Sequence, residues 1–194
     1  EDCGVQCLAV PGRTRDCAFK GDVEYDTIAA IKQAVSMPVI ANGDITSPQQ
    51  AKKILTYTGA DGVMIGRAAQ GRPWIFNEIN HYLNTGKQLP PKSLEAIHHV
   101  MHTHLEHLHQ FYGPEKGFLF ARKHTAWYLG KLEPRLDSDF TENQFNNFIL
   151  ASRQQFNSLM DDAAQLEFLE QFFQNLNQQE KQKEQEQPMR ALAA

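Results

Sequence analysis

Glycine and arginine follow two short apolar runs of this chain, and these residue types at strand ends are typical of anion-binding sites. The run 38–41 leads into Asn42-Gly43-Asp44, and the run 62–65 leads into Gly66-Arg67. A glycine lets backbone N–H groups approach an anion closely, and an arginine adds a planar pair of donors for a phosphate. The spacing alone leaves two interpretations open, because glycines at strand ends also serve simply to form turns.

The elements that must position these residues are parallel strands joined by helices. Both apolar runs are nearly continuous rather than alternating, as expected of strands covered on both faces. Between them, Ser47 and Pro48 are suited to begin a helix and Gly59 to end it, and a helical crossover makes the two strands parallel. An earlier run, 5–10, precedes a helical pattern for which Asp26 is a candidate N-cap. Three strand–helix units predict an α/β fold, either a barrel or an open parallel sheet.

The turn that follows the first strand carries two cations, Arg13 and Arg15. Both are candidates for contacts with phosphate or RNA. Solvated loop charges are the simpler interpretation when this turn is taken by itself.

Length, charge and cysteine content limit the classes of protein. At 194 residues the chain is shorter than the roughly 250 residues of a complete (β/α)8 barrel. A net charge of -4 gives no global attraction to nucleic acid, and no apolar run is long enough to span a bilayer. Cys3, Cys7 and Cys17 lack the spacing of a zinc site or a disulfide framework. We expect a cytoplasmic protein with reduced thiols, and a chain that begins inside a domain because its first strand has no earlier strand to pair with.

The pattern changes at 86–91, a stretch without periodicity that contains two prolines. Beyond it, four amphipathic segments predict an all-α helical bundle, and they begin near Leu94, Phe118, Phe145 and Asp161. Residues 177–187 contain only Asn, Gln, Glu and Lys, which predicts a disordered tail. We therefore expect three parts, at 1–86, 87–176 and 177–194.

Two groups of side chains in the helical part are candidates for ligand binding. The first is a set of histidines on one predicted helix: His98, His99, His102, His104, His107 and His109. His98 and His102 have the i, i+4 spacing of a metal pair, but no second cluster completes a site, so we expect no metal and a polar helix surface. The second is the basic run 122–124 beside Trp127 and Tyr128, which suits phosphate contacts next to base or sugar packing. Basic residues flanking an aromatic core stripe are the structural alternative.

Four motifs resemble those of bacterial tRNA-dihydrouridine synthases, in particular the B-type enzymes of that family. They lie at 9–15, 38–45, 62–74 and 121–124, in the order and spacing of the family, and the similarity extends from Asp2 to about Leu159. The resemblance implies the last three βα units of an FMN-binding TIM (β/α)8 barrel, followed by a helical tRNA-binding domain. It also implies that NADPH reduces the FMN, which then passes a hydride to the uracil C5=C6 bond of a flipped-out tRNA uridine.

The resemblance assigns roles to five residues at the strand ends. By motif position, Asn42, Gly43 and Asp44 would hold the FMN. Gly66 and Arg67 would bind its phosphate, which is the phosphate end expected of the last barrel strands.

In the helical part, the resemblance implies that Arg122, Lys123 and His124 face the RNA.

The chain departs from the family in two respects. Pro11 stands where the family usually has a histidine that approaches the flavin, and nothing matches the motifs of the family's catalytic cysteine and flavin-contacting lysine. We therefore expect a C-terminal portion of a synthase, without a catalytic centre of its own, that needs the N-terminal half of the barrel. The alternatives are a non-catalytic RNA-binding fragment and another FMN- or phosphate-binding barrel oxidoreductase.

Overall fold

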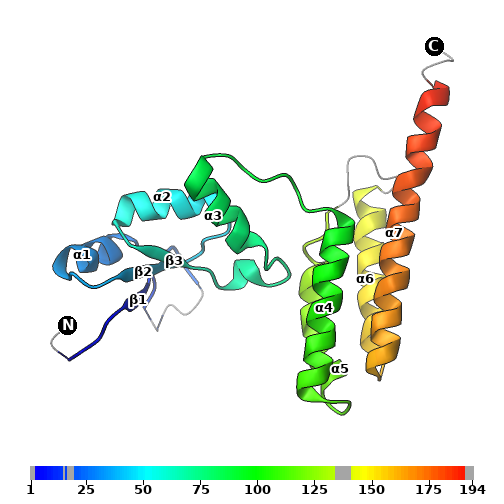
Figure 1. Cartoon of the computed structure of the whole chain (residues 1–194), viewed down its shortest axis with the longest axis horizontal. Helices are drawn as coiled ribbons and strands as arrows, with labels where there is room; N and C mark the ends of the chain where they lie inside the picture. The colour runs from blue at the N-terminus through cyan, green and yellow to red at the C-terminus, as the bar shows by residue number, and fades with distance from the viewer. Residues whose placement is uncertain (1–2, 15, 17–19, 134–140, 191–194) are drawn as a thin grey trace. The chain divides into compact units, whose positions relative to one another are not determined.

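The computed structural model describes residues 3–14, 16, 20–133 and 141–190. It divides into two compact units, Glu1–Pro90 and Pro91–Ala194, which we call the sheet unit and the helical unit (Figure 1). The expected boundary after Gly86 and the observed boundary both fall in the irregular stretch 86–93. Within the described ranges, no helix is long and apolar enough to cross a membrane.

The sheet unit alternates strands and helices along the chain. Its elements are β1 (Leu8–Pro11), α1 (Asp26–Ala34), β2 (Val39–Asn42), α2 (Pro48–Thr58), β3 (Gly62–Met64), the short 3-10 helix η1 (Arg67–Ala69) and α3 (Ile75–Thr85). The strands form one parallel sheet in the order β1-β2-β3. Asn42 pairs with Pro11 on one side and with Met64 on the other, so the carboxyl ends of all three strands meet at one edge. The predicted α/β fold with parallel strands is confirmed; the closed barrel stays a prediction.

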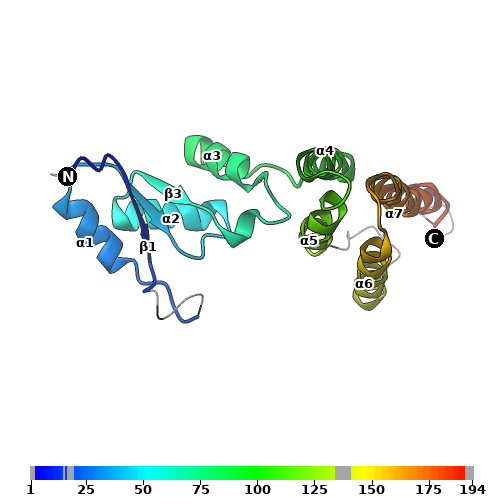
Figure 2. The ribbon, with the colours of Figure 1, turned by 90° about the horizontal axis from the view of Figure 1, so that it is seen from below.

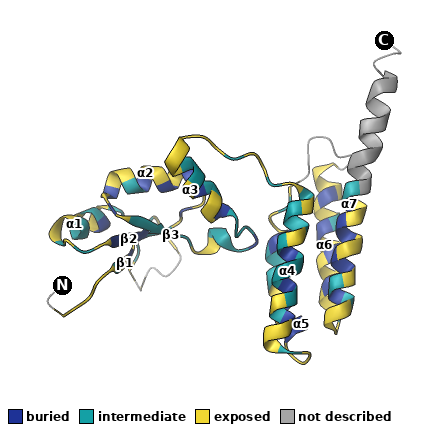
Figure 3. Cartoon of the chain, in the orientation of Figure 1, coloured by how far each residue is buried: buried dark blue, intermediate teal, exposed yellow. Residues whose placement is uncertain are grey.

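The core of the sheet unit lies between β2 and the helices α1 and α2, which contact β2 and each other (Figure 3). Val39 and Ala41 are fully buried on this face. Alternate residues of the sheet point to the opposite face, where Ala9, Pro11 and Met64 are exposed. The sequence predicts that both faces of the sheet are covered, but the described residues cover only one face.

The ends of α2 follow the local signals in the sequence. The Ser47 hydroxyl accepts a hydrogen bond from the Gln50 N–H at 3.2 Å, Pro48 occupies the first helical position, and Gly59 ends the helix in the left-handed conformation.

The predicted cap of α1 is wrong. Asp26 is the first helical residue rather than the N-cap, and its carboxylate accepts the Tyr57 hydroxyl. The carboxylate of Glu24 instead accepts the Thr27 N–H at 2.7 Å, so an acidic side chain outside the helix satisfies the exposed donor.

The helical unit contains all four predicted helices: α4 (Leu94–Tyr112), α5 (Gly117–Leu129), α6 (Glu142–Ser158) and α7 (Asp162–Arg190). Figure 2 views them nearly end-on. The helix α4 packs against α5 and α7, and α6 packs against α5 and α7. The largest fully buried side chains of this unit are Met101, Leu105, Leu129, Phe156, Leu169 and Phe173.

The last helix is longer than the sequence predicts. In place of the disordered tail predicted for 177–194, the structure has helix as far as Arg190, and 191–194 lie outside the described residues. The reason is that Gln, Glu and Lys are good helix formers. Residues 177–187 contain no apolar side chain. The sequence therefore predicts that they do not pack against the other helices, but it does not prevent them from forming a helix.

Candidate functional site

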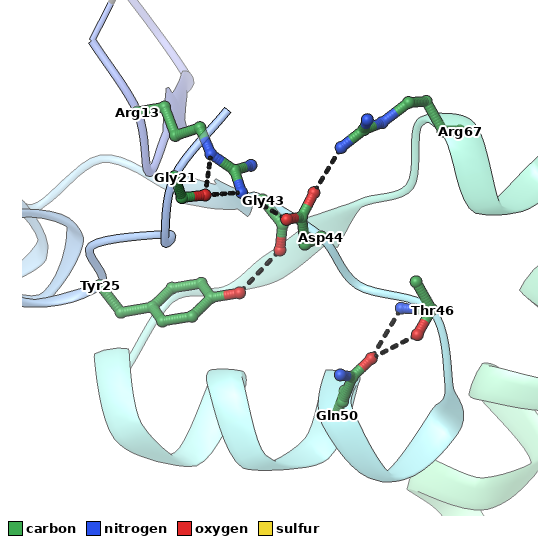
Figure 4. A network of polar contacts seen from close by, with 8 residues as sticks. All are labelled: Arg13, Gly21, Tyr25, Gly43, Asp44, Thr46, Gln50 and Arg67. Atoms are coloured by element: carbon green, nitrogen blue, oxygen red, sulfur yellow. Dashed lines mark hydrogen bonds and ion pairs between the residues drawn. The ribbon is translucent and has the colours of Figure 1, made fainter. Parts of the chain in front are cut away.

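The carboxylate of Asp44 connects the loops that follow the three strands. It accepts a hydrogen bond from the guanidinium of Arg13, which lies beyond β1, and another from Nη2 of Arg67, which lies beyond β3, at 2.7 Å (Figure 4). The Arg13 side chain is only 11% exposed and also donates two hydrogen bonds to the Gly21 carbonyl. The Arg67 side chain is 56% exposed, so it is the cation that faces solvent.

A sharp turn after β2 brings Asp44 between the two arginines. Gly43 has φ +154° and Asp44 has φ +40°, values that turn the chain abruptly at the strand end. The Tyr25 hydroxyl donates to the Gly43 carbonyl at 2.7 Å and holds the turn from the side of α1. The side-chain amide of Asn42 donates to the Met64 sulfur at 3.3 Å, and the backbone carbonyl of Asn42 accepts the Gly12 N–H at 2.8 Å.

The charges of this site favour an anion. The hydrogen bond from Arg13, supported by that from Arg67, holds the pKa of Asp44 below its usual range. The same contact with Asp44 raises the pKa of Arg13. Two guanidinium groups facing one ionised carboxylate leave a net positive charge, which suits a phosphate.

The glycines at the strand ends differ in what occupies the space beside them. A Cβ on Gly12 would lie 2.3 Å from a methyl carbon of Val23, and a Cβ on Gly43 would lie 2.5 Å from the same carbon. At Gly66, no described atom lies within 4 Å of such a Cβ. The first two glycines therefore make room for Val23, and only the third leaves open backbone beside an exposed arginine.

The structure brings the predicted flavin-site residues to one edge of the sheet, with a direct contact between Asp44 and Arg67. The sequence made Arg13 a candidate for phosphate or RNA contacts, with a solvated loop charge as the simpler interpretation, and it did not single out Tyr25 or Val23. The position of Arg13 directly after a strand was a usable signal. Tyr25 and Val23 carried none, because their contacts depend on how the segment before α1 folds back over the strand ends.

The three basic residues predicted to face RNA do not share one environment. Arg122 is half-buried, and its Nη2 donates to the Leu159 carbonyl at 3.0 Å, where α6 ends. Lys123 is exposed, with its Nζ 4.8 Å from the centre of the Trp127 ring. His124 lies edge-on to Trp127 at 5.0 Å, and burial is the main cause that lowers its pKa. Arg122 thus connects α5 with the end of α6, whereas Lys123 reaches solvent.

The two aromatic residues beside this basic run also differ. Tyr128 is buried, 3% exposed, and its hydroxyl lies 3.0 Å from Nδ1 of His104. Trp127 is half-buried, and the Nζ of Lys123 lies over its ring. Only Trp127 of this pair is accessible to a ligand.

The histidines of α4 are divided between core and surface. His109 is buried, with Nε2 3.0 Å from the Gln165 side chain, so the expected polar surface is wrong for this residue. His99 and His107 are exposed. His98 stacks on Phe173 with 4.7 Å between ring centres. Within the described ranges, no group of three or more His, Cys, Asp or Glu side chains is arranged to hold a metal ion.

Comparison with known sequences identifies the family. Residues 1–187 match the sequence profile of dihydrouridine synthase (Dus). The chain is 53% identical over 176 residues to tRNA-dihydrouridine synthase B of Yersinia pestis, covering 91% of this chain and 50% of that protein. It is likewise 53% identical over 175 residues to tRNA-dihydrouridine synthase B of Escherichia coli K12, covering 90% of this chain and 50% of that protein. The chain thus spans about half the length of the curated relatives that it matches. On this evidence, the chain belongs to the dihydrouridine synthase family.

Proposed function

We propose that this chain forms the C-terminal part of an FMN-dependent tRNA-dihydrouridine synthase. The observation that carries the proposal is the edge of the sheet where Arg67 faces solvent beside the open backbone of Gly66. A phosphate fits this edge because the cluster has excess positive charge and Gly66 presents no side chain. When bound, FMN reduced by NADPH would supply the hydride for the uracil C5=C6 bond of a tRNA uridine in the cytoplasm.

The residues of this chain would hold and orient the flavin. Arg67 and the backbone at Gly66 would bind its phosphate, and the turn formed by Asn42, Gly43 and Asp44 would support the flavin from the neighbouring strand. Asp44 would also orient the guanidinium of Arg67, because its carboxylate accepts one of the arginine's hydrogen bonds. The catalytic cysteine and the remaining strands would come from the N-terminal half of the barrel.

The flavin site is tested by titrating FMN into the chain supplied with the missing half of the barrel. Replacing Arg67 by alanine is expected to lower FMN affinity roughly 10- to 100-fold, because one charge-assisted contact with phosphate is lost. Flavin fluorescence measures the binding. Arg72→Ala is the matched control, since Arg72 pairs with Glu78 at 2.6 Å outside the cluster and should leave the affinity unchanged. Equal affinity of the Arg67→Ala and unsubstituted proteins would contradict the proposed phosphate site.

We further propose that the basic run of α5, Arg122, Lys123 and His124, belongs to the tRNA-binding surface. Among the three, Lys123 is the exposed cation and is expected to make the phosphate contact. Arg122 contributes mainly by holding the carbonyl of Leu159 and so fixing α6 beside α5.

Replacing Lys123 by glutamine is therefore expected to weaken tRNA binding and to reduce the slope of log affinity against log salt by about 1. The measurement is a salt titration of tRNA affinity. Lys52→Gln is the matched control, because Lys52 lies over the Tyr82 ring at 5.7 Å in the sheet unit. An unchanged salt slope for Lys123→Gln would remove Lys123 from the binding surface.

A further inference from the structure

A group of aromatic side chains lies exposed where α4 ends and α5 begins. Phe111 is 82% exposed, Phe120 is 45% exposed and Tyr112 is 39% exposed. Tyr112 and Phe120 stack with 4.1 Å between ring centres and 21° between ring planes, and Phe111 lies edge-on to Tyr112 at 4.9 Å. These rings contact one another across two helices while keeping much of their surface in water.

The aromatic group continues along α5 toward the basic run. Phe120, Lys123 and Trp127 are spaced so that they share one face of the helix. At 1.5 Å per residue, Phe120 and Trp127 lie roughly 10 Å apart along the axis, enough for about three stacked nucleotides. We call the set Tyr112, Lys116, Phe120, Lys123 and Trp127 the α4–α5 stripe.

The charge of the stripe indicates which partner suits it. From Tyr112 to Lys131 the sequence has four Lys or Arg residues and one acidic residue, Glu115, although the whole chain has a net charge of -4. The Nζ of Lys123 lies over the Trp127 ring, so a cation and an accessible aromatic surface occur together. Exposed aromatic rings interleaved with cations suit an unpaired nucleic-acid strand, because every base offers a flat face and every nucleotide a negative charge.

We propose that the α4–α5 stripe binds unpaired nucleotides of the RNA substrate, with bases stacking on the Tyr112–Phe120 pair and on Trp127, and phosphates contacting Lys116 and Lys123. The inference rests on the proposed tRNA function and adds the part of the RNA that this surface recognises. In this inference the exposed aromatic residues stack on bases, whereas a surface that bound tRNA through its phosphates alone would need only cations.

The test uses the full chain with Trp74→Phe, so that Trp127 is the remaining tryptophan. A short oligouridylate is expected to quench Trp127 fluorescence and to bind, whereas an abasic strand of the same length and charge binds much more weakly. The double variant Tyr112→Leu/Phe120→Leu is expected to lose roughly 5- to 100-fold in affinity for the oligouridylate, the range for removal of stacking. Leu150→Ala is the matched control, because Leu150 is 53% exposed on α6 of the same unit.

Two results would overturn the inference. One is equal binding of the abasic strand and the oligouridylate. The other is an RNA affinity of the Tyr112→Leu/Phe120→Leu variant equal to that of the unsubstituted chain. If the unsubstituted chain is a dimer and this variant is a monomer, the stripe is instead a protein interface. A circular dichroism spectrum like that of the unsubstituted chain shows that the variant is folded.

Binding of intact tRNA separates this inference from the proposed function. If the unsubstituted protein supplied with the missing half of the barrel does not bind tRNA, the proposed function fails, and this inference fails with it. If tRNA binds but the stripe variant retains full affinity, only the inference fails.

Discussion

Replacing Gly43 by alanine is expected to lower the free energy of unfolding of the sheet unit by roughly 2 to 4 kcal/mol. Two costs combine at this position. The backbone has φ +154°, which side-chain-bearing residues rarely adopt, and the new Cβ would lie 2.5 Å from a methyl carbon of Val23. Denaturant unfolding followed by fluorescence measures the loss. Trp74 reports the unfolding of the sheet unit, and Trp127 reports that of the helical unit.

Two further variants separate the steric clash from the backbone strain. In the Val23→Ala background, both branching methyls of Val23 are gone and its Cβ remains at 3.5 Å, so Gly43→Ala should cost less than in the unsubstituted protein. Gly86→Ala is the control for strain alone, since Gly86 has φ +70° and no described atom within 4 Å of the new Cβ. If Gly43→Ala costs no more than Gly86→Ala, Val23 does not restrict this turn.

Replacing Phe173 by alanine is expected to lower the free energy of unfolding of the helical unit by about 3 to 5 kcal/mol. Phe173 is 1% exposed on α7, stacks on His98 of α4 and lies edge-on to Phe172 at 5.2 Å. Removing the ring leaves a cavity between helices that are distant in sequence. The readout is the unfolding transition reported by Trp127.

The control for this substitution is Phe111→Ala. Phe111 belongs to the same unit but is 82% exposed, so its truncation should change the free energy of unfolding by no more than about 0.5 kcal/mol. Similar losses for Phe111→Ala and Phe173→Ala would show that α7 does not pack on α4 as described.

Features that depend on neighbouring residues were predictable from the sequence. Ser47, Pro48 and Gly59 define the ends of α2 because capping chemistry acts within a few residues. The parallel order of the strands followed in the same way from apolar runs that alternate with helices. The expected cap at Asp26 failed because Glu24, a residue type that is not a usual N-cap, supplies the acceptor.

Features that depend on distant partners were not predictable in this way. Arg122 and Lys123 are adjacent in sequence, yet one guanidinium reaches the carbonyl of Leu159 and the other side chain reaches solvent. Which of two neighbouring cations faces inward depends on where α6 ends, and the spacing within α5 does not contain that information. The flavin residues were assigned from motif positions, and the contact of Arg13 with Asp44 depends on β1 lying beside β2.

The shared carboxylate of Asp44 connects the two arginines electrostatically. Arg13 and Arg67 donate to different oxygens of this carboxylate, from the loops that follow β1 and β3. An anion bound by Arg67 would meet a guanidinium that Asp44 already holds in place. By thermodynamic linkage, if the contact of Arg13 with Asp44 changes the affinity of Arg67 for an anion, the bound anion changes the strength of that contact by the same free energy. We therefore expect that a substitution of Arg13 changes the affinity of the β3 loop for an anion.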